Sequence, residues 1–84
     1  MSVVLDRNAI DKLVTDTLVD FGVDRSQITD DATFDDLEVD SLDIVELRQA
    51  VKREFAIDIR ATEFDTIETI GQALALIYQR AGLG

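Results

Sequence analysis

The chain contains no cysteine and no histidine among its 84 residues. The lack of cysteine excludes a disulfide framework and a thiolate metal site, so hydrophobic burial has to hold the fold together. The lack of histidine removes the side chain that most often serves as a general base near neutral pH. There is also no glycine-rich phosphate loop and no recognised metal-ligand spacing. We therefore expect neither an enzyme nor a metal site.

Basic residues are scarce: eight Lys and Arg stand against 18 Asp and Glu, for a net charge of −10. This balance argues against nucleic acid as a partner, because a basic footprint supplies most of that affinity. Between Ser26 and Leu47 there is no base at all, and solubility alone does not require such one-sidedness. The eight acids of this segment are Asp30, Asp31, Asp35, Asp36, Glu38, Asp40, Asp43 and Glu46. They predict partners with basic patches, attracted at long range and weakened by salt.

Long apolar runs are missing too, and none approaches the roughly 20 residues of a membrane-spanning helix. Met1–Leu5 does not resemble a secretory signal, which begins with a charged region followed by an apolar core. These absences predict a cytoplasmic chain without a membrane partner. The length and the 46% apolar content predict one domain over residues 1–84 with one small core. The high charge favours a monomer.

Three segments show the spacing of amphipathic helices. The first has apolar positions from Ile10 to Phe21; Asp6 or Asn8 is its expected start, and Gly22 its end. The second begins at Asp40-Ser41 and ends near Phe55. The third has Thr69 as its N-cap and stops at Gly82. No stretch alternates with the period of a strand, so the predicted fold is an all-α bundle.

Two connections complete the predicted bundle of three main helices. Thr62–Asp65 fits a single short helical turn. Gly22–Val39 is a long loop between the first two helices, and loops of this length in compact domains are either anchored or functional. We expect Ile28, Phe34 and Leu37 to anchor it by dipping into the core.

The middle helix has two different faces. At about 100° per residue one stripe is apolar and is expected to face the core: Ile44, Leu47, Val51 and Phe55. Leu42 and Val45 project to the other side, near Asp43, Glu46 and Gln49. A few apolar side chains ringed by charge are typical of a docking surface. The alternative is that the long loop covers Leu42 and Val45, or that they are ordinary exposed residues.

Ser41 lies at the expected start of this helix. Without an adjacent base it is a poor nucleophile of its own, but the N–H groups and dipole of a helix N-terminus favour a phosphate group there. Asp40 with Asp43 approximates a capping box, which would leave the Ser41 hydroxyl free for modification. The alternative is that Ser41 only caps the helix.

The run Leu37–Leu47, with the sequence LEVDSLDIVEL, resembles the acyl carrier protein signature, and the resemblance extends over roughly residues 6–78. It implies that Ser41, flanked by Asp40 and Leu42, receives 4'-phosphopantetheine from coenzyme A. The thiol of that group holds acyl intermediates as thioesters. The implied partners are a phosphopantetheinyl transferase and acyl-processing enzymes such as acyltransferases and ketosynthases. The docking face of this reading comprises Asp40, Leu42, Asp43, Val45, Glu46 and Gln49.

The interior of the bundle is a candidate shelter for an apolar acyl chain, at ~0.8 kcal/mol per buried methylene. The candidate pocket residues are Ile44, Leu47, Val51, Leu74 and Ile77. In the family, some members shelter their cargo and others leave it in water, and both behaviours stay open here.

Departures from the family pattern bear on the pathway. Glu38 stands where glycine is usual, which adds charge and reduces backbone freedom before Ser41. Arg48, Lys52 and Arg53 stand where carriers of bacterial fatty acid synthesis are usually acidic. This difference favours polyketide or other specialised acyl biosynthesis over fatty acid synthesis. A peptidyl carrier is an alternative, although Asp40 counts against it.

Two readings without a prosthetic group also fit the acidic composition. A calcium loop starting at Asp36 places Glu38 and Asp40 correctly, but Ser41 replaces the required glycine and Leu47 the final glutamate. Only weak calcium binding is compatible with that pattern. An acidic helical protein-interaction module would explain the charge and Leu42 with Val45, but not Ser41.

Overall fold

The computed structural model describes residues 6–83. It contains the α-helices α1 (Arg7–Asp20), α2 (Ser41–Phe55), α3 (Ala61–Phe64) and α4 (Ile70–Arg80), and the 3₁₀ turn η1 (Arg25–Gln27). Over these residues there is no β-strand, only an isolated antiparallel bridge between Thr33 and Thr69. The prediction of an all-α bundle with three main helices and one short turn is confirmed.

Some sequence-based expectations fall outside this range. The expectation that the chain lacks a secretory signal concerns Met1–Leu5, and the predicted domain extends to Gly84; these residues lie outside the described part of the chain. Within residues 6–83, no helix is both long enough and apolar enough to cross a bilayer.

Each main helix begins at a side chain that accepts a hydrogen bond from the first turn. The Asp6 carboxylate accepts from the Ala9 N–H at 2.7 Å, and the Thr69 hydroxyl accepts from the Gln72 N–H at 3.1 Å. Asp6, and not Asn8, is therefore the cap of α1. Gly22, at φ +102°, follows the end of α1 as predicted, in a conformation that glycine adopts without strain.

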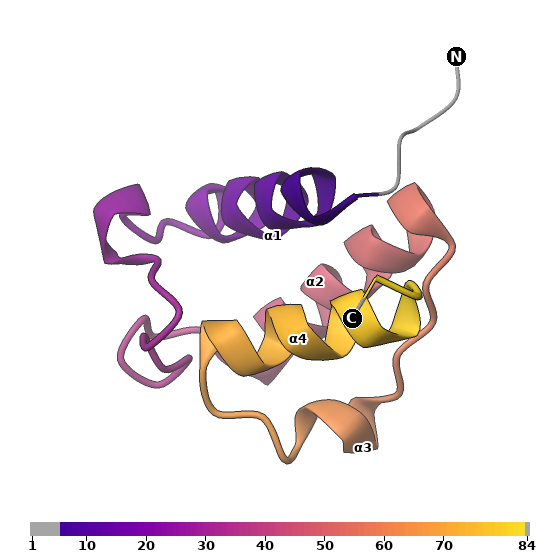
Figure 1. Ribbon diagram of the computed structural model, residues 1–84. Helices are drawn as coiled ribbons and strands as arrows, with labels where there is room; N and C mark the ends of the chain where they lie inside the picture. The colour runs from indigo at the N-terminus through magenta and orange to yellow at the C-terminus, as the bar shows by residue number, and fades with distance from the viewer. Residues whose placement is uncertain (1–5, 84) are drawn as a thin grey trace.

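The three main helices surround one core (Figure 1), with α1 packed against both α2 and α4. The side chains that are almost completely buried are Ile10, Val14 and Leu18 of α1, Leu47 and Val51 of α2, and Ile70, Ala73 and Ile77 of α4. Burial of one large aliphatic side chain contributes about 1.5–3 kcal/mol. This cluster is consequently the main source of stability in a chain without disulfides.

The long α1–α2 connection is hydrogen-bonded to the start of α4. The Ile70 N–H donates to the Ala32 carbonyl at 2.9 Å, and the Gly71 N–H to the Asp30 carbonyl at 3.0 Å. A Cβ at Gly71 would lie only 3.0 Å from the Asp30 carbonyl oxygen, so this approach needs glycine. In the other direction, the Phe34 N–H donates to the Glu68 carbonyl at 3.1 Å. The loop thus caps α4 and is itself held in place.

The predicted anchors of this connection pack as expected. Phe34 is buried, and Ile28 and Leu37 are partly buried against the core. The prediction missed Val39, which is also buried and lies two residues before Ser41. The connection therefore enters the core twice before α2 begins.

The short helix α3 is tied to its neighbours by polar contacts. Glu63 accepts from the Arg60 N–H at 2.9 Å and pairs with Arg80 of α4. The backbone hydrogen bond from Arg60, with the Arg80 contact second, lowers the pKa of the Glu63 carboxyl. On the other side, Arg48 of α2 donates from Nε to the Ile59 carbonyl at 2.8 Å. These contacts hold α3 close to both α2 and α4.

Tyr78 links α4 to α1. Its hydroxyl donates to the Asp11 carboxylate, and the Arg7 guanidinium carbon lies 5.0 Å from the centre of its ring. Burial, together with the hydrogen bond to the Asp11 carboxylate, raises the pKa of Tyr78 to about 12.

Tyr78 is the one tyrosine of a chain without tryptophan, so its ionisation can be followed by near-ultraviolet absorbance alone. We expect a midpoint near pH 12 in the folded protein and near 10 in urea. Because the folded state favours the neutral phenol, the contribution of Tyr78 to stability should be fully present below pH 10 and be lost between pH 10 and 12.

The variant Asp11→Asn should lower the folded midpoint, because it removes the negative charge next to the phenol. Asp16→Asn, on the same helix and in contact with Lys12 and Arg25, is the matched control. Equal midpoints in the folded and denatured states would contradict the assigned contact.

Candidate functional site

Ser41 is the first residue of α2 and is exposed to solvent. The helix cap is Asp40, whose carboxylate accepts from the Asp43 N–H at 3.0 Å, while the Asp43 carboxylate accepts from the Asp40 N–H at 3.4 Å. This is the predicted capping box. Within residues 6–83 the Ser41 hydroxyl has no hydrogen-bond partner, so it is not needed to cap the helix.

The segment before Ser41 is a tight turn that is held by hydrogen bonds within its own backbone. The Thr33 carbonyl accepts from the Leu37 N–H at 3.2 Å, and the Phe34 carbonyl accepts from the Val39 N–H at 3.0 Å. Since Phe34 and Val39 are both buried, the two ends of this turn are anchored in the core. The position of Ser41 is therefore set by the fold, although its side chain is exposed.

Glu38 adopts a left-handed backbone conformation within this turn, at φ +58°. For a residue with a Cβ atom this conformation costs roughly 1–2 kcal/mol. Glycine is the usual residue at this position in the family that the sequence resembles, and the positive φ gives the physical reason for that preference. The Glu38 side chain itself is exposed and adds a carboxylate three residues before Ser41.

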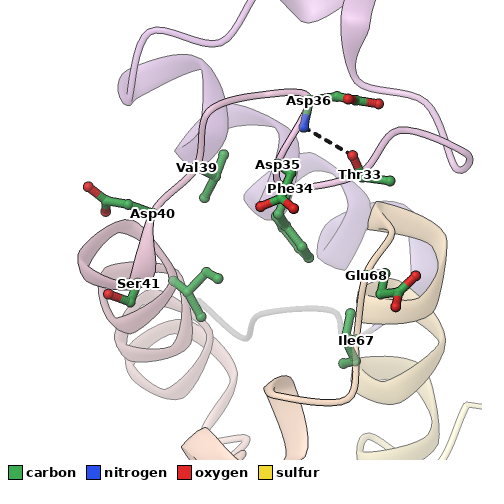
Figure 2. A pocket seen from close by; sticks show the side chains of 10 residues that line it. Thr33, Phe34, Asp35, Asp36, Val39, Asp40, Ser41, Ile67 and Glu68 are labelled. Atoms are coloured by element: carbon green, nitrogen blue, oxygen red, sulfur yellow. Dashed lines mark hydrogen bonds between the residues drawn. The ribbon is translucent and has the colours of Figure 1, made fainter.

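A surface hollow of about 630 Å³ lies between the start of α2 and the residues before α4. Its apolar floor includes Phe34, Val39 and Ile67, and its acidic residues are Asp35, Asp36, Asp40 and Glu68. Figure 2 shows Asp40 and Ser41 on one side of this hollow and Ile67 with Glu68 on the other, with the Ser41 hydroxyl turned away from Phe34. The Asp36 N–H donates to the Thr33 hydroxyl at 3.0 Å across the rim.

A second, smaller hollow of about 120 Å³ lies on the other side of Ser41, between α2 and α3. It is lined by Ser41, Ile44, Val45 and Arg48 of α2 and by Ala61, Phe64 and Asp65 of the α3 region. Ser41 and Ile44 line both hollows. The serine thus stands between an acidic hollow and one that contains an arginine.

The predicted docking face is open to solvent. Leu42 is 74% exposed and Val45 is 38% exposed, so the long loop does not cover them. Asp40, Glu46 and Gln49 are exposed as well, and Asp43 is half-buried by its part in the cap. The structure therefore brings the six predicted residues together around the first half of α2.

The predicted acyl pocket is closed in this structure. Leu47, Val51 and Ile77 are completely buried in the packed core, and Leu74 is partly buried against it. Of the five predicted residues, Ile44 lines the two hollows beside Ser41. A shelter formed by the other four requires the helices to part, and it stays a prediction.

The three bases of α2 do not form one surface. Arg48 is half-buried and bound to the Ile59 carbonyl, and Lys52 lies 4.0 Å from the Asp58 carboxylate in the following loop. Arg53 is exposed and lines a separate hollow with Glu46. The three bases, from which the pathway was predicted, therefore have different surroundings, and Glu46, which shares a hollow with Arg53, is a residue of the predicted docking face. The contact of Arg48 could not be predicted from residue types, because its partner is a main-chain oxygen.

The described residues contain no group of three or more acidic side chains arranged to hold a metal ion. Together, a small helical bundle and an exposed serine without a base beside it are the features of a carrier domain. A family model described as "Phosphopantetheine attachment site" matches residues 2–77, and the chain belongs to this family.

Membership of the family confirms the resemblance seen in the sequence. Its domains hold 4'-phosphopantetheine covalently and are non-catalytic carriers. They interact with a phosphopantetheinyl transferase and with enzymes that process the carried groups. The free serine hydroxyl at the start of α2 fits such a group, because a phosphate is favoured at a helix N-terminus.

The separate contributions of Asp40 and Ser41 to the free energy of unfolding can be measured. We expect Asp40→Ala to lower the free energy of unfolding by about 1 kcal/mol, because it removes the cap. Ser41→Ala should change it by less than about 0.5 kcal/mol, as for an ordinary surface substitution. Urea denaturation followed by circular dichroism gives both values. A loss for Ser41→Ala as large as that for Asp40→Ala would show that the hydroxyl has a structural role.

Proposed function

We propose that Ser41 is the residue that carries 4'-phosphopantetheine, and that the chain is an acyl carrier protein. The observation that carries this proposal is the exposed Ser41 hydroxyl, left free because Asp40 caps the helix. The sequence Asp40-Ser41-Leu42 and the match to the family model support it further.

The residues around Ser41 indicate how the work is divided between the carrier and its partners. The chain has no histidine or cysteine, and no base is bonded to the serine, so the transferase has to supply the base. The bound group contributes a thiol that holds acyl groups as thioesters. The chain itself contributes the position of the serine and a surface that other enzymes bind.

Attachment is tested by intact mass after incubation with coenzyme A, magnesium and a broad-specificity phosphopantetheinyl transferase. We expect one added phosphopantetheinyl group on the wild type and none on Ser41→Ala. Ser26→Ala is the matched control, because Ser26 is also exposed and lies in a turn capped by an aspartate; it should be modified like the wild type. No added mass on the folded wild type with an active transferase would refute the proposal.

We further propose that the first half of α2 is the surface that partner enzymes bind. Leu42 and Val45 supply exposed apolar contacts, Asp40, Asp43 and Glu46 supply negative charge, and Gln49 extends the surface. A basic patch on the partner complements this arrangement, with apolar contact at the centre and charge at the rim.

A charge reversal tests the docking face. We expect Glu46→Lys to lower kcat/KM for modification by the transferase about tenfold, and more at low salt, because a rim charge acts mainly on association. Leu42→Ala should lower it by a similar factor through lost apolar contact. Glu54→Lys makes the same charge change at an exposed position near the end of α2 and should stay within about twofold. Equal effects of Glu46→Lys and Glu54→Lys would show that net charge matters and the face does not.

For the pathway, we propose polyketide or other specialised acyl biosynthesis, with fatty acid synthesis and a peptidyl carrier as the alternatives. Arg53 beside Glu46 supports this choice, since it adds a positive charge next to the acidic docking face. Incubation of the modified protein with acyltransferases and ketosynthases of each type, and with an amino-acid-activating enzyme, distinguishes the three. Loading of an amino acid in preference to acyl groups would favour the peptidyl carrier.

A further inference from the structure

The two hollows beside Ser41 differ in charge. The larger one is lined by Asp35, Asp36, Asp40 and Glu68, and neither lysine nor arginine lines it. The smaller one, between α2 and α3, contains Arg48 together with Asp65. A negatively charged group attached at Ser41 is repelled by the first set of side chains and attracted by Arg48. The larger hollow offers more room for a group attached at Ser41, but the smaller hollow is the more favourable one for a negative charge.

A hydrogen bond fixes the orientation of the Arg48 side chain, but in the described part of the chain its positive charge is not paired with a carboxylate. Its Nε donates to the Ile59 carbonyl at 2.8 Å, and the side chain is half-buried. Over residues 6–83, no carboxylate lies within ion-pair distance of its guanidinium, although the chain has ten more acids than bases. Because the guanidinium is planar and its Nε is fixed, its two Nη groups are held in place as donors.

A continuous track on α2 joins Ser41 to Arg48. Ser41, Ile44, Val45 and Arg48 have the spacing i, i+3, i+4 and i+7, which places them on one face of the helix. Seven residues correspond to a rise of about 10.5 Å, and helical side chains lean toward the N-terminus, which shortens the gap from the arginine to the serine. Ala61 and Phe64 line the opposite wall. The track is thus apolar between a hydroxyl at one end and a cation at the other.

We propose that Arg48 is a positioning residue, and that its guanidinium holds the proximal half of the phosphopantetheine group along this track. The inference rests on attachment at Ser41, as proposed above. The chemical groups of phosphopantetheine match the residues of the track in order. From Ser41 outward, phosphopantetheine has a phosphodiester, then a branched dimethyl carbon, then hydroxyl and amide oxygens. Val45 and Phe64 suit the dimethyl carbon, and the Nη groups of Arg48 suit the oxygens.

The size of the hollow limits what it holds. Pockets that enclose a whole drug-sized ligand have about 300–1,000 Å³, whereas this one has about 120 Å³. Only a segment of the group fits, and the thiol end stays outside. Arg48 would therefore restrict where the group points while leaving the carried acyl chain accessible to partner enzymes.

The test compares each protein before and after modification, with the added mass confirmed first. In the wild type we expect the backbone amide signals of Ala61 and Phe64 and the Arg48 Nε–H signal to shift in ¹H–¹⁵N spectra, while those of Thr33 and Glu68 do not. Modification should also lower the unfolding equilibrium constant about three- to fivefold, as for one charge-assisted hydrogen bond that is partly exposed. Both effects should disappear in Arg48→Leu.

The control variants separate this role from the structural one. Arg53→Leu makes the same change at an exposed arginine of α2 outside the track, and it should retain both effects. Arg48→Lys keeps the charge but not the planar fork, and it should lose most of the stabilisation. Since each value is a difference between modified and unmodified protein, the loss of the Ile59 contact cancels. If Arg48→Leu does not fold, Arg48→Gln provides the same comparison.

Two results would overturn the inference: shifts at Thr33 and Glu68 instead of Ala61 and Phe64, or unchanged shifts in Arg48→Leu. Shifts restricted to Ser41 and its chain neighbours would overturn it as well. A wild-type protein that gains no mass would refute attachment itself, so the two failures are distinguishable.

Discussion

The hydrogen bonds between the α1–α2 connection and the start of α4 are the constraint on which the site depends. The carbonyls of Asp30 and Ala32 accept from the first N–H groups of α4, and the Phe34 N–H donates back to Glu68. A long loop without disulfides or strands would otherwise be free to move. Once it is fixed, Phe34 and Val39 enter the core at set positions, and α2 has to begin where it does. The exposed Ser41 is therefore positioned by contacts that it does not make itself.

The excess of acids is compatible with this small fold because the carboxylates stay at the surface. None is buried in the described residues, and those at the start of α2 also satisfy its free N–H groups. The same charges set the electrostatic character of the surface around Ser41, where basic partners are attracted. Fold and function thus use the same side chains: Asp40 caps the helix and also contributes to the face that we propose for docking.

Much of the fold could be predicted from the sequence, because helical periodicity and caps are local signals. The start of α1 at Asp6 or Asn8, the capping box of Asp40 with Asp43 and the position of Leu42 away from the apolar stripe of α2 all follow from residues within a few positions of one another. The features that could not be predicted join distant positions. The Nε of Arg48 binds a main-chain oxygen 11 residues away, and Val39 looks like an ordinary loop residue until the path of the connection is known. The closed core around Leu47 and Ile77 likewise depends on how three helices pack.

The helix α2, which bears Ser41, is flanked on both sides by a non-glycine residue in the left-handed backbone conformation. Glu38 shortly before it and Ala56 immediately after it both have φ near +58°, although neither is glycine. Each position therefore carries conformational strain of roughly 1–2 kcal/mol, in a domain of a size whose total stability is marginal. Replacement of Glu38 or Ala56 by glycine or asparagine would reduce this backbone strain. The two ends of α2 are therefore places where a single substitution could raise the free energy of unfolding without altering the core.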